Sequence, residues 1–412
     1  MKKEKKHNAR SLVPSLRFPE FRVAGEWEKE KLGDIGEVVS GLTYSPDDVA
    51  ENGVLVLRSS NIQDGVLSFE DNVFVKVNSY NAVKENDILI CVRNGSRNLI
   101  GKNALINKES EGMAFGAFMS IYRSKYNLFL YQWFSSDFFF NQVKKNLGAT
   151  INSINGNDLK KYSVSFPSLP EQQKIADCLS SLDELIQFQT KKLEALQSHK
   201  KGLLQNLFPA EGETVPKLRF PEFEGTGNWV EVGGDYLFDP ITNKNHDSTL
   251  PILAITQEHG AIPRNLIDYN ISVTEKSVES YKVVEPGDFI ISLRSFQGGI
   301  EYSNYHGICS PAYIVLRKKR ELCEHFYRYF FKTAEYIRGL NKNIEGIRDG
   351  KMVSYKQFSE LLIPYPSLPE QQRIADCLTS VDALIQEQMD SLDMLKSHKK
   401  GLLQGLFPVM GE

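Results

Sequence analysis

Two stretches of this chain repeat the same pattern of apolar and polar positions. Residues 168–209 and 367–408 align without a gap, and 30 of the 42 positions are identical. In both, apolar residues recur at alternating steps of four and three residues, which is the spacing of a coiled-coil seam. The first seam consists of Ile175, Leu179, Leu182, Ile186, Gln189, Leu193, Leu196, Lys200, Leu203 and Leu207. The second consists of Ile374, Leu378, Val381, Ile385, Gln388, Leu392, Leu395, Lys399, Leu402 and Leu406.

The pattern predicts one long helix in each stretch. Pro170 stands in the first turn, where its missing N–H costs no hydrogen bond. A helix from Glu171 to Leu207 would be roughly 55 Å long. The alternative, one buried helix in each of two separate domains, would not need so long or so regular a seam.

The two seams most simply bury each other as an antiparallel pair. That pairing would bring Gln189 and Gln388 to the middle of the helices, where their amides would form a polar layer. Such a layer costs stability but specifies register and orientation.

The helix ends carry more apolar residues than a seam requires. Either the chain's own domains or a partner protein would cover this extra surface, so the end residues are also candidate docking residues. They are Leu204 and Phe208 in the first copy and Leu403 and Phe407 in the second.

The duplication extends beyond the helices. The sequence VPSLRFPEF at 13–21 returns as VPKLRFPEF at 215–223, with a tryptophan at the same distance behind each. A tandem repeat of this kind has to be interpreted as one unit used twice. We expect an N-terminal segment at 1–24, a domain at 25–167, a helix at 168–209, a linker at 210–226, a domain at 227–366, and a helix with the C-terminus at 367–412.

The two domains are expected to be mostly β with short helices. Short β-rich runs are separated by Asn, Gly and Asp turns, for example DILICV, MSIYR, DFIISL and AYIVLR. Two aromatic-rich runs, YQWFSSDFFFNQVKKNLG and EHFYRYFFKTAEYIRGL, have helical spacing. The predicted fold class is therefore α+β: two mixed domains joined by two long antiparallel coiled-coil helices, in a pseudo-two-fold internal duplication.

Composition narrows the functional classes. The chain has 412 residues, 41% of them apolar, which is ample for two domain cores. Its net charge of −3 excludes nucleic-acid binding through a globally basic surface, so any such binding would use local patches. There is no run long enough to span a membrane and no signal-peptide pattern, so a cytoplasmic protein is expected. The five cysteines show no metal-binding spacing, and no metal site is expected.

No catalytic motif is present in the sequence. The stretch from Gly95 to Lys102 resembles a P-loop but has one residue too many between its glycines and Asn103 where Ser or Thr is required. Pro46-Asp47 with Asp158-Leu159-Lys160 matches a nuclease pattern formally, but the second half has no counterpart. We therefore assign no catalytic residue.

Polar, basic loops follow apolar strands at matching places in both halves. Arg, Asn and Gln form paired hydrogen bonds to base edges, while Lys and Ser more often bind phosphates. In the first half the candidate DNA contacts are Arg93, Asn94, Ser96, Arg97, Lys102, Thr150, Asn152 and Asn155. In the second half they are Arg294, Ser295, Gln297, Lys342, Arg348 and Lys351.

With SLPEQQKIADCLSSLDELI and KKGLLQNLFP occurring almost unchanged twice, the sequence resembles the specificity subunit of type I restriction-modification enzymes. The resemblance implies two target recognition domains that each read half of a bipartite, asymmetric double-stranded DNA sequence. It also implies docking of two methylation subunits on the helices and restriction subunits in the full complex. The methylation subunits would carry S-adenosylmethionine and modify adenine N6, so this chain would need no cofactor.

Two other functions are compatible with parts of the sequence. A stand-alone nuclease or methyltransferase would require catalytic motifs that are missing. A coiled-coil adaptor between proteins would not need the polar loops shared by both domains. Salt-dependent binding of a duplex distinguishes the DNA-binding function from the adaptor.

Overall fold

The structure is a computed structural model of the chain. It describes residues 12–147, 152–247, 249–267, 278–342 and 353–409. The chain forms two compact units. The first unit consists of Met1–Thr190 with Ser391–Glu412, and the second consists of Lys191–Asp390.

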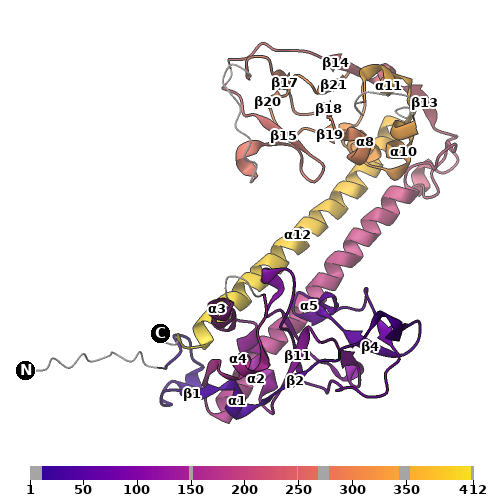
Figure 1. The fold of residues 1–412 in the computed structure, drawn as a ribbon. Helices are drawn as coiled ribbons and strands as arrows, with labels where there is room; N and C mark the ends of the chain where they lie inside the picture. The colour runs from indigo at the N-terminus through magenta and orange to yellow at the C-terminus, as the bar shows by residue number, and fades with distance from the viewer. Residues whose placement is uncertain (1–11, 148–151, 248, 268–277, 343–352, 410–412) are drawn as a thin grey trace, which may run out of the picture. The chain divides into compact units, whose positions relative to one another are not determined.

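Two long helices contribute to both units. Helix α5 spans Leu169–Asn206 and helix α12 spans Leu368–Leu406, and they are drawn side by side in Figure 1. Every predicted seam position is buried or half-buried, whereas most positions between them are exposed. This is the burial pattern of a coiled-coil seam, so the prediction of two paired helices is confirmed.

The helices run antiparallel, as predicted. In the first unit, Ile175 near the start of α5 shares a core with Leu406 near the end of α12. In the second unit, Ile374 near the start of α12 shares a core with Leu207 near the end of α5. The other named seam residues agree with this arrangement: Leu179 and Leu378 are buried, and Leu182, Ile186 and Ile385 are half-buried.

The two seam glutamines occupy enclosed positions. Gln388 is 5% exposed and Gln189 is half-buried. These values agree with seam positions. The amide layer between them stays a prediction.

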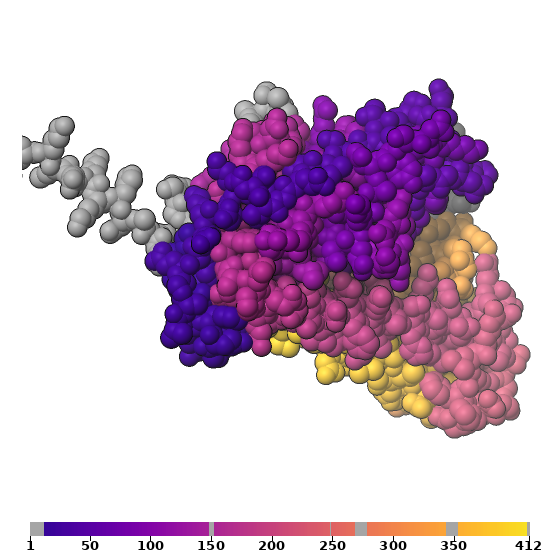
Figure 2. Space-filling view, turned by 90° about the horizontal axis from the view of Figure 1, so that it is seen from below, coloured from indigo at the N-terminus to yellow at the C-terminus, as the bar shows by residue number. Residues whose placement is uncertain are grey.

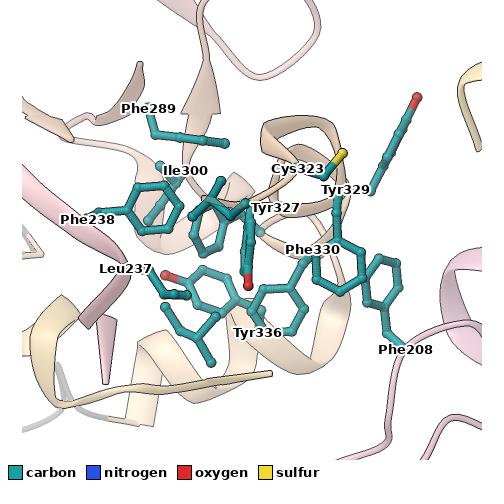
Figure 3. Close-up of a cluster of buried hydrophobic side chains, with 14 of the residues drawn as sticks. Phe208, Leu237, Phe238, Phe289, Ile300, Cys323, Tyr327, Tyr329, Phe330 and Tyr336 are labelled. Carbon is teal, nitrogen blue, oxygen red and sulfur yellow. The ribbon is translucent and has the colours of Figure 1, made fainter. Parts of the chain in front are cut away.

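The apolar helix ends are covered by the chain's own domains. The ring of Phe407 lies 6.1 Å from Trp27 and 5.3 Å from Phe129, and only 2% of Phe407 is exposed. Figure 3 shows Phe208 beside Phe330 in the aromatic core of the second unit, with ring centres 5.8 Å apart.

The remaining end residues are enclosed in the same way. Leu403 is buried in the first core, and Leu204 is half-buried against the second. Of the two alternatives, cover by the chain's own domains agrees with this burial, because domain residues fill the space around these four end positions.

Each helix carries a lysine on the seam that pairs with an aspartate of the other helix. Lys200 Nζ lies 2.6 Å from an oxygen of Asp382 in the second unit. In the first unit Lys399 forms the same pair with Asp183. A parallel pairing in register would place like charges opposite one another, so these ion pairs favour the antiparallel orientation.

The same aspartates bind the domains to the helices. In the first unit the amide of Gln132 donates to Asp183 across 3.2 Å. In the second unit the hydroxyl of Tyr329 donates to Asp382 across 2.8 Å. Each aspartate thus joins the two helices and one domain.

The first domain is built around a four-stranded antiparallel sheet. Its order is β2 (Glu37–Ser40), β11 (Met119–Arg123), β8 (Ile88–Cys91) and β9 (Asn103–Leu105). A second sheet has the order β10 (Ala114–Phe115), β4 (Val54–Leu57), β7 (Phe74–Val75) and β3 (Val49–Ala50). The paired strands β1 (Glu28–Lys31) with β12 (Ser163–Phe166), and β5 (Ile62–Gln63) with β6 (Val66–Leu67), complete it.

Strand β8 is the centre of the first domain. Ile88 and Ile90 pack into the core that contains α5 and α12, and Leu89 and Cys91 pack against the second sheet. Side chains of a strand alternate between faces, so a strand with all four residues buried has a layer on each side. The helices α1 (Leu32–Ile35), α2 (Asn127–Phe134), α3 (Asp137–Asn146) and α4 (Gly156–Lys160) complete the domain.

The second domain repeats this plan. Its sheet has the order β14 (Phe238–Ile241), β21 (Ile314–Lys318), β18 (Phe289–Ile291) and β19 (Glu301–Tyr302). Three further pairs are β13 (Val230–Gly233) with β22 (Leu362–Tyr365), β15 (Leu253–Thr256) with β16 (Gly260–Pro263), and β17 (Lys282–Val284) with β20 (Gly307–Cys309). Its helices are α6 (Gly234–Leu237), α8 (Ser295–Gly298), α9 (Glu324–Phe330), α10 (Ala334–Lys342) and α11 (Tyr355–Glu360).

The quoted β-rich runs form strands, and each aromatic-rich run forms two short helices. Hydroxyl side chains stand at the break in each run. Ser136 Oγ donates to Trp133 O across 2.6 Å, and Thr333 Oγ1 donates to Phe330 O across 2.8 Å. These side chains give the end of the first helix an alternative hydrogen bond, which favours a turn.

In the part of the chain that the structure describes, no helix has the length and apolarity needed to cross a membrane.

The repeated LRFPEF segments fasten the helix starts. Both nitrogens of the Arg17 fork donate to the carboxylate of Glu171, each across 2.7 Å. The side chains are 7% and 1% exposed. In the second unit Arg219 forms the same pair with Glu370. Figure 2 shows the indigo segment that carries Arg17 against the magenta residues around the start of α5.

Breaking the Arg17–Glu171 pair should destabilise the first unit. Arg17→Met would leave a buried carboxylate without its partner, at a cost of about 3 kcal/mol in the free energy of unfolding. Arg17→Lys should recover only part of this, because one ammonium group cannot form the paired hydrogen bonds. Urea denaturation measures the effect. The exposed Arg22→Met is the control, and equal stability of the Arg17→Met and Arg22→Met variants would contradict the prediction.

Candidate nucleic-acid interface

The first candidate loop begins where the central strand of the first domain ends. After β8 the amides of Val92 and Arg93 both donate to the carbonyl of Phe118, across 3.0 and 3.1 Å. Since β8 is buried on both faces, the loop at 93–98 starts from a rigid base. The side chains of Arg93, Ser96 and Arg97 are exposed.

The loop before α5 lies beside this first loop. Ile154 N donates to Val92 O across 2.8 Å, and Arg93 forms an antiparallel bridge with Ser153. The side-chain amide of Asn152 donates to Gly95 O across 3.1 Å. The structure therefore brings together Arg93, Asn94 and Asn152, which the sequence placed in two separate loops.

A third segment joins the surface without having been recognised in the sequence. The side-chain amide of Asn94 donates to Ser59 Oγ across 3.1 Å, and Lys102 Nζ donates to Ser59 O across 3.4 Å. Ser59 belongs to a short turn that follows β4, and Arg58 stands next to it. The pattern of a polar turn after a buried strand was available as a signal, because the run VLVLRSS has it.

Asn155 and Arg97 also have hydrogen-bond partners within the domain. Asn155 caps α4, because its side chain accepts from Asp158 N across 2.8 Å. Arg97 donates to Leu147 O across 2.9 Å while its side chain remains exposed. Thr150 lies outside the described residues.

The second domain places its candidate loop at the matching position, after β18. Arg294 and Gln297 are exposed on either side of the start of α8. Ser295 is 1% exposed and its hydroxyl accepts from Ser292 N across 2.9 Å, so it holds the loop and does not reach the surface. Lys342 forms an exposed ion pair with Glu211. Arg348 and Lys351 lie outside the described residues.

The chemistry of these surfaces is that of hydrogen-bond donors and positive charge. Burial raises the pKa of the Cys91 thiol, and burial raises the pKa of Cys309 to about 12. Both thiols are therefore protonated near neutral pH and are poor nucleophiles. Among the described residues, no group of three or more His, Cys, Asp or Glu side chains is placed to hold a metal ion. The arrangement suits binding of phosphates and base edges.

Comparison with known proteins gives a consistent result. The family model of the type I restriction modification DNA specificity domain matches residues 24–198 and 233–393. The chain is 24% identical to the MjaVIII type I restriction enzyme specificity subunit of Methanocaldococcus jannaschii over 412 residues, which cover 93% of this chain and 92% of that protein. It is 21% identical to the EcoKI specificity subunit of Escherichia coli over 378 residues, covering 84% and 80%.

A solved structure has the same fold. The S subunit of a type I restriction-modification system from M. genitalium matches with a TM-score of 0.61 at 16% identity, covering 97% of this chain and 100% of that one. The family model matches both halves and well over half of the length. The chain therefore belongs to the type I restriction-modification DNA specificity family, the non-catalytic DNA-recognition subunits of these systems.

Proposed function

We propose that this chain reads a bipartite, asymmetric DNA sequence and positions adenine-N6 methylation and restriction subunits on it. Residues 25–167 and 227–366 are the two recognition domains, and the linker is 210–226. One observation carries the proposal. Two domains of divergent sequence present exposed basic loops at the same place, after the buried strands β8 and β18, on nearly identical helices.

The remaining subunits would supply the chemistry. Two methylation subunits with bound S-adenosylmethionine would dock on the helices, restriction subunits would join them, and the complex would work in the cytoplasm. Because Phe208 and Phe407 are covered by the domains, the docking surface must be elsewhere on the helices. Leu185 and Leu384 stand at equivalent positions and are 41% and 50% exposed, which makes them the better candidates.

Each recognition loop should control its own half of the target. In cells that carry the methylation subunits, the wild-type chain should direct N6-methyladenine to one split, non-palindromic motif. Arg93→Ala should relax or weaken one half of that motif, and Arg294→Ala the other, since a paired arginine contact discriminates bases by about 1–3 kcal/mol. Methylation mapping by single-molecule sequencing reads the result. Arg22→Ala is the control, and variants that alter the same half would contradict the assignment.

The helices should set the gap between the half-sites. Removing one heptad from each, 191–197 and 390–396, keeps the seam in phase and retains both Lys–Asp pairs. Each helix shortens by about 10.5 Å, which is equivalent to about three base pairs of DNA at 3.4 Å each. The variant should prefer a correspondingly shorter gap or lose binding, as measured with duplexes of graded spacing.

Duplicating the same heptads provides the matched control for the spacer. This insertion should lengthen the preferred gap by about three base pairs. A gap preference that is unchanged in both variants would show that the helices do not determine the spacing.

Charges at the exposed apolar helix positions should weaken assembly without unfolding the chain. Leu185→Glu with Leu384→Glu should lower the affinity for purified methylation subunits at least tenfold, because a charge would be buried at the contact. The thermal midpoint should change little, because these side chains are exposed. Titration calorimetry measures the affinity. The control is Gln187→Glu with Gln386→Glu on another face of the helices, and equal affinities for the two double variants would exclude this docking surface.

A further inference from the structure

Phe118 is an exposed aromatic residue on a rigid turn. The turn runs from Gly116 to Met119, whose amide donates to Gly116 O across 2.8 Å. Its neighbours Phe115 and Met119 are buried, whereas 57% of Phe118 is exposed. The backbone is held firmly while the ring faces outward.

A second contact explains why this turn cannot shift easily. Leu42 N donates to Phe115 O across 2.7 Å, and Leu42 forms a parallel bridge with Gly116. A Cβ on Gly41 would lie 2.1 Å from Gly116 O, so the two segments approach as closely as glycine allows. The ring is therefore presented from a backbone packed on two sides.

The exposed ring is flanked by a cation from the candidate DNA-binding loop. The guanidinium carbon of Arg93 lies 5.4 Å from the centre of the Phe118 ring, within the range of a cation–π contact. The Phe118 carbonyl also accepts from Arg93 N. An aromatic ring with an arginine at its side combines a stacking surface for bases with a charge for phosphates.

The second domain has the same turn without the ring. Tyr313 N donates to Ser310 O across 3.1 Å, and this turn precedes β21 as the first turn precedes β11. The position that corresponds to Phe118 is Ala312. Leu293, beside Arg294, is 50% exposed, but it offers no aromatic face for stacking.

We propose that Phe118, positioned by Arg93, is a stacking wedge that inserts at one base step of the half-site read by the first domain. The proposal rests on the proposed function, because it assumes that this domain binds DNA. A wedge of this kind partly unstacks the step and kinks the duplex. It therefore favours flexible pyrimidine–purine steps, which unstack at low cost, and gives specificity through deformation. The second half-site lacks this contribution because Ala312 has no ring.

The test uses the full chain with its methylation subunits and a duplex that carries its mapped target. 2-Aminopurine, which brightens when it is unstacked, replaces bases of the first half-site one at a time. The wild-type complex should brighten at one step. Phe118→Ala should abolish this signal and weaken binding about 10- to 100-fold, the range expected for loss of base stacking. Phe118→Trp should retain the affinity.

Further variants separate stacking from charge and from folding. Phe118→Ala should leave the salt dependence of binding unchanged, whereas Arg93→Ala removes a positive charge from the interface and should reduce its slope by about one. Phe118→Leu keeps an apolar side chain that can still insert but has no π face, so it should retain part of the signal and lose the affinity that stacking supplies. Leu128→Ala, an exposed apolar position in the same domain, is the control and should bind normally.

Two results would overturn the wedge. One is wild-type affinity of both Phe118→Ala and Phe118→Leu, and the other is the absence of brightening at every position of the first half-site in a wild-type complex that binds. A wild-type complex that does not bind the duplex at all would instead refute the proposed function. The two failures are therefore distinguishable.

Discussion

The burial of each helix end inside a domain core is the constraint on which the rest of the structure depends. Helix α5 begins in the core of the first unit and ends in the core of the second, and α12 does the reverse. The first domain completes its core with the C-terminal end of α12, and the second completes its core with the end of α5 and the start of α12, which flank it in the sequence. The aromatic residues Phe407 and Phe208 make this dependence strong, because each buries a large apolar surface among other rings.

Polar contacts determine the relative orientation of the two paired helices. An apolar seam alone permits parallel, antiparallel and shifted pairings, since leucines pack against leucines in each of them. The pairs Lys399–Asp183 and Lys200–Asp382 oppose unlike charges only in the observed arrangement. Through Gln132 and Tyr329, the same aspartates also fix the domains on the helices.

The positions of the proposed recognition surfaces follow from where the buried strands end. Strands β8 and β18 are enclosed on both faces, so the loops that follow them emerge from a fully buried strand in each domain. Under the proposed function, only the loop side chains then need to differ for the two domains to read different sequences. Arg93 and Arg294 keep a positive charge at the matching place, while Phe118 and Ala312 differ at the neighbouring turn. This explains how a duplicated frame carries two divergent surfaces.

The sequence by itself determined the duplication, the two long helices and the α+β class, because periodicity over many turns depends on local spacing alone. It also placed Arg93 and Arg294 in equivalent loops. Only the tertiary structure decided that the domains cover Phe208 and Phe407, that Ser295 is buried, and that Ser59 and Phe118 join the candidate interface. These are contacts between segments far apart in the chain, and no local pattern records which segments meet. The repeated LRFPEF can be read from the sequence. The buried Arg17–Glu171 ion pair, through which the repeat binds the start of α5, forms only in the folded chain.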